Sequence, residues 1–257
     1  RSPRLATDHA GREGAALDVG VASEVLAAAL HTRIVVGVEG RAAAGAIGAL
    51  PLNRALRASW LTGALIGLEC RNAGFTTVAA PVLDLLVPDA HLVIGDRSPG
   101  SEPLTVARLG RAMAAGLLAA GVEPVGKHAP GHGRAMVDSH LSLPVVDANT
   151  LEPDVTPFVL NIDLPWLMTA HIVYSMLDPI YPATLSHRII TEVIRGRFGF
   201  RGLLVTDDLA MHALKGAPAD RAVAALTAGC DIALYCAGDF ASTEAVLTAC
   251  HDMPPAT

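Results

Sequence analysis

The segment 127–144 holds an unusual density of side chains that can bind a substrate or move a proton. Within fourteen residues it carries three histidines, a lysine and an aspartate: Lys127, His128, His132, Asp138 and His140. Pro130, Gly131 and Gly133 favour a loop over a helix or a strand, so these polar groups are expected to be exposed. The segment therefore predicts a catalytic or binding loop.

A second group of candidates lies where an apolar segment ends in two carboxylates. Residues 203–206 read as a buried strand, and Asp207 and Asp208 follow it directly. Catalytic acids of parallel α/β barrels lie at this kind of junction. The alternative is that one of the two aspartates only caps the turn or helix that follows, which aspartate does well.

The elements that must position these loops alternate between β-branched runs and amphipathic stretches. The sequence predicts strands at 33–38, 76–80, 124–128, 166–172, 203–206 and 231–235, and helices at 53–72, 103–121 and 184–195. Residues 16–20 are a candidate seventh strand, and no GxGxxG follows the first strand. This order predicts an α/β fold of the TIM-type (β/α) barrel class, possibly incomplete or irregular at its N-terminal strand.

The overall composition and charge indicate a single globular domain and argue against nucleic-acid and membrane partners. The 257 residues are 51% hydrophobic and only 4% aromatic, with a formal net charge of −6, which fits one domain over 1–257 and provides no basic patch for nucleic acid or an anionic membrane. No apolar run approaches the roughly 18 residues of a membrane span, and the four cysteines lack CxxC spacing. A cytoplasmic protein is expected, although the missing initial methionine indicates a trimmed chain or a fragment.

Several segments together resemble glycoside hydrolase family 3, and within it the bacterial β-N-acetylglucosaminidases (β-hexosaminidases) of cell-wall recycling. Residues 127–144 are similar to the KHFPGHG...DSH...LP pattern, 202–211 to the strand with SDDLSM, and 94–98 to IGDRSF. Residues 80–84 and 168–171 also fit, and the resemblance extends over about 33–240, leaving 1–30 poorly matched.

The resemblance implies a retaining mechanism with named roles. Asp207 would be the nucleophile and His140 the general acid/base, oriented by Asp138 two residues earlier in an extended loop. A histidine can donate a proton to the leaving oxygen and then accept one from water near neutral pH. The resemblance further implies no cofactor and no metal, a monomer, and a muropeptide substrate that contains N-acetylglucosamine.

Other polar residues of the matching motifs have less direct roles. The resemblance makes Arg97, Lys127 and His128 sugar-binding residues, although Lys127 could be solvated and Arg97 could form a structural ion pair. His132 and His171 are expected to support the loop and the strands. Asp84 and Asp208 could satisfy backbone amides.

The sequence departs from the family at its second strand. The family pattern VDxEGG has a sugar-binding aspartate where this chain has Gly37. Losing a charged acceptor costs about 1.5 to 3 kcal/mol of binding, or roughly ten- to a hundredfold. Glu39 could compensate, and Ala129 replaces a bulky aromatic residue.

Three alternatives remain open. The first is another family 3 β-glycosidase or a phosphorylase, and the second is a degenerate sugar-binding relative weakened by Gly37. The third is a metallohydrolase using His128, His132, His140 and Asp138, which Pro130 and the loop glycines disfavour because they prevent a helix that would align the histidines.

Overall fold

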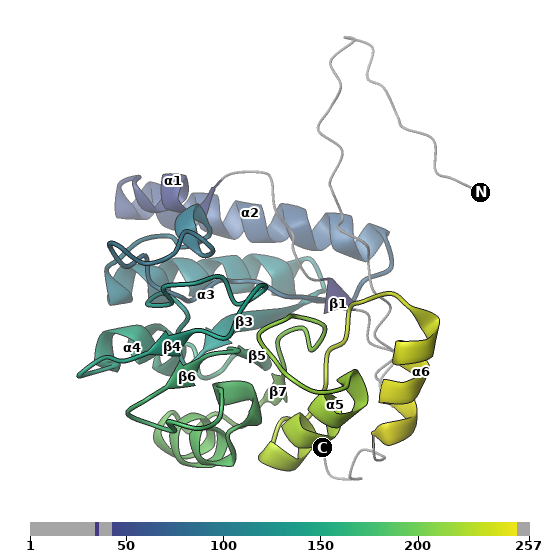
Figure 1. Ribbon diagram of the computed structural model, residues 1–257. Helices are drawn as coiled ribbons and strands as arrows, with labels where there is room; N and C mark the ends of the chain where they lie inside the picture. The colour runs from purple at the N-terminus through teal and green to yellow at the C-terminus, as the bar shows by residue number, and fades with distance from the viewer. Residues whose placement is uncertain (1–33, 36–42, 251–257) are drawn as a thin grey trace.

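A parallel sheet forms the centre of the molecule. The computed structural model describes residues 34–35 and 43–250. Five hydrogen-bonded strands lie in the order β1-β2-β3-β5-β7, and every neighbouring pair is parallel (Figure 1). They are β1 (Ile34–Val35), β2 (Thr77–Val78), β3 (Glu123–Ala129), β5 (Trp166–Thr169) and β7 (Leu203–Val205). The prediction of an α/β fold with parallel strands is confirmed.

The predicted strand at 231–235 is wrong as a strand, since among the described residues it forms a single bridge, between Ile232 and Val205. The reason is that side-chain oxygens accept backbone N–H groups of this segment. In a continuous strand, backbone carbonyl oxygens of β7 would accept them. The backbone N–H of Leu234 donates to the hydroxyl of Thr206, and that of Cys236 donates to the carboxylate of Asp208. The segment still extends the sheet past β7.

The described residues also form six α-helices. They are α1 (Ala44–Gly48), α2 (Leu52–Asn72), α3 (Pro103–Ala119), α4 (Glu152–Val159), α5 (Pro218–Ala228) and α6 (Phe240–Ala249). The helices predicted at 53–72 and 103–121 are confirmed within two residues. At 184–195 the prediction of one α-helix is wrong, because a 3₁₀ turn, η2 (Ala183–Leu185), and a π-helix, η3 (Ile189–Arg197), replace it. Ser186 separates them, and its hydroxyl accepts the N–H of Ile189.

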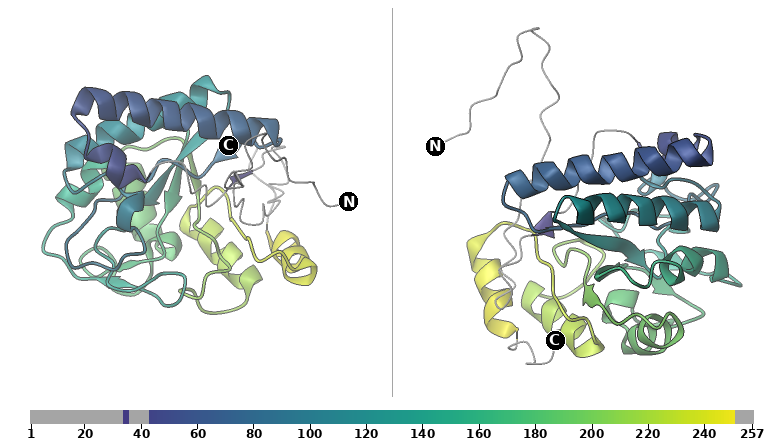
Figure 2. Two further views of the ribbon diagram at one scale, coloured as in Figure 1. Left: turned by 90° about the horizontal axis from the view of Figure 1, so that it is seen from above. Right: turned by 180° about the vertical axis from the view of Figure 1, so that it is seen from behind.

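The longest helices pack through glycines. A Cβ on Gly63 of α2 would lie 2.1 Å from the carbonyl oxygen of Met113, and one on Gly116 of α3 would lie 2.1 Å from that of Trp60. The two backbones therefore touch where the helices run side by side along one face of the sheet (Figure 2). This close packing fixes the layer outside β2 and β3.

The opposite face of the sheet is buried without any described helix over it. One apolar cluster gathers side chains from β3, β5 and β7, from the residue after β2 and from the segment after α5: Ala79, Val125, Trp166, Met168, Val205, Ile232 and Leu234. Alternate residues such as Leu167 and Leu204 instead join the cluster that contains η3 and α5. A sheet whose inner face is filled by its own strands has the arrangement of a barrel interior. Closure is not seen in the described residues, where β1 and the 232 segment are the two ends.

The parallel order sends the loops after β3, β5 and β7 to the same edge. A second, two-stranded sheet joins the first two of these loops, because β4 (Val145–Val146) pairs in parallel with β6 (Val173–Tyr174). The predicted strand at 16–20, the substitution at Gly37 and the proposed compensating residue Glu39 lie outside the described residues.

Candidate active site

The two aspartates after β7 have different surroundings. Asp207 is 7% exposed, its Oδ1 accepts the N–H of Asp208 at 2.9 Å, and its Oδ2 lies 4.0 Å from Nε2 of His128. The carboxylate of Asp208 instead accepts the backbone N–H groups of Ala210 and Cys236, both at 2.9 Å. The capping role therefore belongs to Asp208, and Asp207 faces the residues at the end of β3.

The environment of Asp207 keeps it ionised. Burial raises its pKa, but the charges of His128, His171 and Lys127 and the N–H of Asp208 outweigh this effect, and the pKa falls to about 2. Burial raises the pKa of Asp208. At neutral pH Asp207 is thus a buried, ionised carboxylate, which is the state that a carboxylate nucleophile requires.

Asp138 and His140 form a hydrogen-bonded pair on the loop after β3. Oδ1 of Asp138 accepts from Nδ1 of His140 at 2.7 Å and from its backbone N–H at 2.9 Å. The pair lies in a tight turn, because Leu141 and Ser142 both donate to the carbonyl oxygen of Asp138. The predicted contact between Asp138 and His140 is confirmed, but the extended loop proposed to explain it is wrong. The Asp138 carboxylate caps a turn by accepting the backbone N–H of His140, and this turn places the His140 ring against the same carboxylate.

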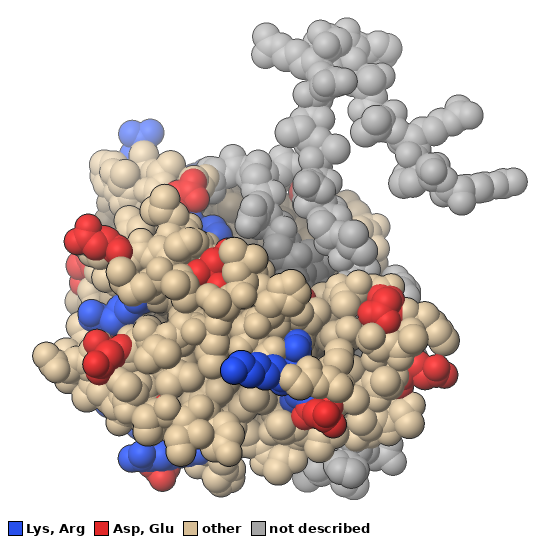
Figure 3. Space-filling model, viewed as in Figure 1, with Lys and Arg blue, Asp and Glu red and all other residues tan. Residues whose placement is uncertain are grey.

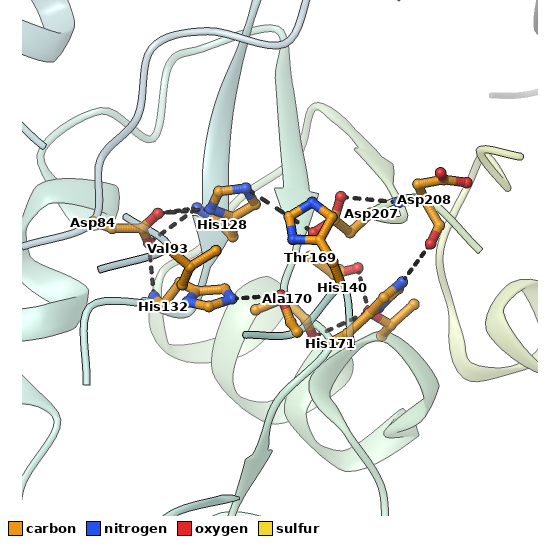
Figure 4. Close-up of polar contacts among 12 residues, drawn as sticks. Asp84, Val93, His128, His132, His140, Thr169, Ala170, His171, Asp207 and Asp208 are labelled. Carbon is orange, nitrogen blue, oxygen red and sulfur yellow. Dashed lines mark hydrogen bonds and ion pairs between the residues drawn. The ribbon is translucent and has the colours of Figure 1, made fainter. Parts of the chain in front are cut away.

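The acid/base candidate is accessible, and its loop is tied to the loop of Asp207. The side chain of His140 is 58% exposed. Its carbonyl oxygen accepts the N–H of His212, which follows Asp207 in the chain, at 3.2 Å. In the view of Figure 4 the His140 ring projects over the space between His128 and Asp207. Burial tends to raise the pKa of Asp138, but the hydrogen bonds from His140 lower it.

The predicted sugar-binding residues lie at the end of β3 and in a turn that follows β2. Lys127 and His128 are the buried end of β3, with Lys127 only 4% exposed, so the alternative of a solvated lysine is wrong. Arg97 lies after β2 in the 3₁₀ turn η1 (Gly95–Arg97), is partly buried, and donates from Nη1 to the carbonyl oxygen of Val93 at 3.0 Å. The structure brings Lys127 and His128 together with Asp207, whereas Arg97 contacts the backbone just before its own turn.

Comparison with known proteins identifies the family. The family described as Glycosyl hydrolase family 3 N terminal domain matches residues 12–252. The chain belongs to glycoside hydrolase family 3. A relative from Alkalilimnicola ehrlichii, named Beta-hexosaminidase, is 44% identical over 181 residues, which are 68% of this chain and 51% of the relative. This family 3 chain therefore spans about half the length of the curated relatives it matches.

Solved structures of family 3 proteins have the same fold. A β-N-acetylglucosaminidase from a Paenibacillus species superposes with a TM-score of 0.73 at 35% identity, covering 83% of this chain and 41% of the other. NagZ from Neisseria gonorrhoeae, in complex with N-trifluoroacetyl-D-glucosamine, gives a TM-score of 0.68 at 31% identity, covering 80% of this chain and 66% of the other.

Sequence reasoning missed several residues that hold the loop of this family 3 domain. Arg134 pairs with the buried Asp154 of α4 through Nε and Oδ2 at 2.8 Å, and the hydroxyl of Tyr174 donates to the carbonyl oxygen of Gly131 at 2.8 Å. Asp84, considered only as a partner for backbone amides, also accepts a ring N–H of His128. The partners lie 20 to 44 residues apart in sequence, so no local spacing reveals them.

The two histidines expected to support the site make such contacts. His132 Nε2 lies 2.9 Å from the hydroxyl of Ser139, and His171 contacts the hydroxyl of Thr184 and the carbonyl oxygen of Asp208 (Figure 4). Among the described residues, no group of three or more His, Cys, Asp or Glu side chains is arranged to hold a metal ion.

His132 makes stability depend on pH. Burial and the charge of His128 lower its pKa to about 4, and its Nδ1 is buried without a partner. Between pH 6.5 and 4 the unfolded chain binds the proton more readily than the folded one, so stability falls as pH falls through this window. We expect His132 to remove about 2 kcal/mol of unfolding free energy between pH 7 and pH 5.

Urea unfolding at these two pH values measures the effect. His132→Gln, which keeps an amide near Ser139, should lose less stability on acidification than the original chain, whatever its stability at pH 7. Equal losses in the two proteins would contradict the assignment.

Proposed function

We propose that this chain is the catalytic domain of a retaining exo-β-N-acetylglucosaminidase. The observation that supports it most is the combination of a buried, ionised Asp207 with an accessible Asp138–His140 pair on the adjoining loop. Relatives named Beta-hexosaminidase and a solved relative bound to an N-acylated glucosamine analogue support the same activity.

The proposed reaction has two steps. First, a carboxylate oxygen of Asp207 bonds to the anomeric carbon while the bond to the aglycone oxygen breaks, and Nε2–H of His140 protonates that oxygen. Second, His140 takes a proton from water, the hydroxyl bonds to the anomeric carbon, and the Asp207 carboxylate leaves. Asp138 accepts Nδ1–H of His140 throughout, and so stabilises the positive charge on the ring. Lys127, His128 and Arg97 bind the sugar hydroxyls.

The substrate proposed is a terminal β-linked N-acetylglucosamine on a peptidoglycan-derived muropeptide. We further propose a single domain acting as a monomer in the cytoplasm without a cofactor. The match of the family over residues 12–252 supports the single domain. On the face drawn in Figure 3 basic and acidic side chains are scattered singly, which suits an uncharged sugar. None of the helices in the described part is both long and apolar enough to cross a membrane.

The experiment that tests the function uses the purified chain and 4-nitrophenyl N-acetyl-β-D-glucosaminide. We expect steady release of 4-nitrophenol, with a kcat/KM that exceeds that for the corresponding β-D-glucoside. The sugar product should be free N-acetylglucosamine both with and without added phosphate. Preference for the glucoside would indicate another β-glycosidase, a sugar phosphate would indicate a phosphorylase, and binding without turnover would indicate a degenerate relative.

A further inference from the structure

A single buried carboxylate connects the two halves of the site. Asp84 is 0% exposed and accepts three N–H groups: Nδ1 of His128 at 2.6 Å, the backbone N–H of His128 at 3.1 Å, and the backbone N–H of His132 at 2.7 Å. Figure 4 shows it on the far side of His128 from Asp207. Asp84 therefore contacts His128, which faces the nucleophile, and also His132, at the base of the loop that carries His140.

The chemistry of this position requires a carboxylate. All three partners are donors, so the group between them must only accept. Burial raises the pKa of Asp84, but the charge and the hydrogen bond of His128 and the contacts of His132 outweigh this effect and lower the pKa. An amide of the same shape would place its own N–H₂ against one of these donors, which leaves a buried donor unsatisfied.

On the nucleophile side, Asp84 fixes the tautomer of His128. Because the ionised carboxylate can only accept, the ring must carry its proton on Nδ1. Nε2 then points toward Asp207 at 4.0 Å, which is too far for a direct hydrogen bond. When the ring is uncharged, Nε2 carries a lone pair that can accept a hydrogen bond from a sugar hydroxyl.

On the acid/base side, His132 links Asp84 to the turn that contains His140. Its backbone is held by Asp84, and its Nε2 contacts the buried hydroxyl of Ser139, which lies between Asp138 and His140. A pKa of about 4 keeps the His132 ring neutral near neutral pH. The buried, unpartnered Nδ1 fits a lone pair better than an N–H, so Nε2–H donates to Ser139.

Within the described part of the chain, the turn at 136–142 that carries His140 has few other anchors. The side chains of Met136 and Leu141 are exposed. Two backbone bonds assist, from His91 to the carbonyl of Ala135 and from His212 to that of His140. The His132–Ser139 contact is the buried side-chain link between the base of the loop and the turn.

We propose that Asp84 is a positioning residue for both catalytic groups: it sets the tautomer of His128 beside Asp207 and, through His132 and Ser139, orients the turn that presents His140. The consequence for catalysis rests on the proposed function. The consequences for tautomer and loop order do not, and they are measurable in the unliganded chain.

The first test compares Asp84→Asn with Asp154→Asn, which alters another buried carboxylate that holds the same loop. Long-range ¹H–¹⁵N NMR of the histidine rings should report the Nδ1–H form of His128 in the original chain and in Asp154→Asn, and its loss in Asp84→Asn. We also expect Asp84→Asn to lower kcat for the chromogenic substrate about a hundredfold. An unchanged His128 tautomer in Asp84→Asn, or the same change in both variants, overturns the proposal.

The second test removes the connector, which is the hydrogen bond between His132 and Ser139. Ser139→Ala should speed amide hydrogen exchange over 137–142 and lower kcat about tenfold with little change in KM, because the acid is misplaced while sugar binding persists. Ser142→Ala, an exposed serine of the same turn, is the control and should do neither. Unchanged exchange in Ser139→Ala overturns the connector. If the chain hydrolyses no glycoside, the proposed function fails while the NMR and exchange results still decide the role of Asp84.

Discussion

Replacing Asp207 by alanine is expected to lower kcat/KM for the chromogenic N-acetylglucosaminide by at least about a thousandfold, as for other enzymes that lose a nucleophile. The carboxylate is ionised, buried and beside the buried Lys127 and His128. Alanine removes both the bond-forming oxygen and the negative charge that stabilises the oxocarbenium-like transition state.

The neighbouring aspartate provides a matched control. Asp208→Asn changes the carboxylate next to Asp207 in the chain, whose oxygen accepts the backbone N–H groups of Ala210 and Cys236. We expect it to reduce thermal stability more than the chemical step. In Asp207→Ala, added azide can enter the vacated space and attack the anomeric carbon, giving a glycosyl azide of α configuration. Retention of a tenth or more of the original rate by Asp207→Ala would remove Asp207 as the nucleophile.

The sequence predicted the parts of this molecule that depend on local pattern. The apolar run before Asp207 and the spacing of apolar residues in α2 and α3 define elements that the structure contains. The order of these elements predicted a parallel barrel with its catalytic groups where strands end, and in the structure the loops after β3 and β7 lie together at that edge. The bond between His212 and His140 is where they meet.

What the sequence could not predict depends on partners that are distant in the chain. Asp84 accepts from residues 44 and 48 positions away. Likewise, the strand expected at 231–235 is interrupted because Thr206 and Asp208 bond to it from another segment. Between Asp138 and His140 the contact was predicted but the turn was not, since an aspartate that caps its own turn has the same i, i+2 spacing as an extended loop.

Replacing His140 by alanine is expected to produce a loss that depends on the leaving group. General acid catalysis contributes about 10²- to 10⁴-fold, and most where the leaving oxygen is a poor leaving group that needs a proton. We therefore expect the full loss with an N-acetylglucosaminyl disaccharide and a much smaller loss of kcat/KM with a 2,4-dinitrophenyl glycoside. For the latter, kcat should still fall, because water must attack the glycosyl-enzyme without a base.

Asp138→Asn tests whether the negative charge of Asp138 matters in addition to its hydrogen bond to His140. Asparagine can still accept Nδ1–H of His140, so the ring keeps its place, but the neutral amide stabilises the protonated ring less than a carboxylate 2.7 Å away does. Its effect should therefore follow the same dependence on leaving group as His140→Ala and be smaller. His187→Ala, an exposed histidine whose ring contacts the carbonyl oxygen of Ala228, should leave both substrates unaffected. If His140→Ala slowed the disaccharide and the dinitrophenyl glycoside equally, His140 would act by holding the loop, and the proton donor would have to be sought elsewhere at the same sheet edge.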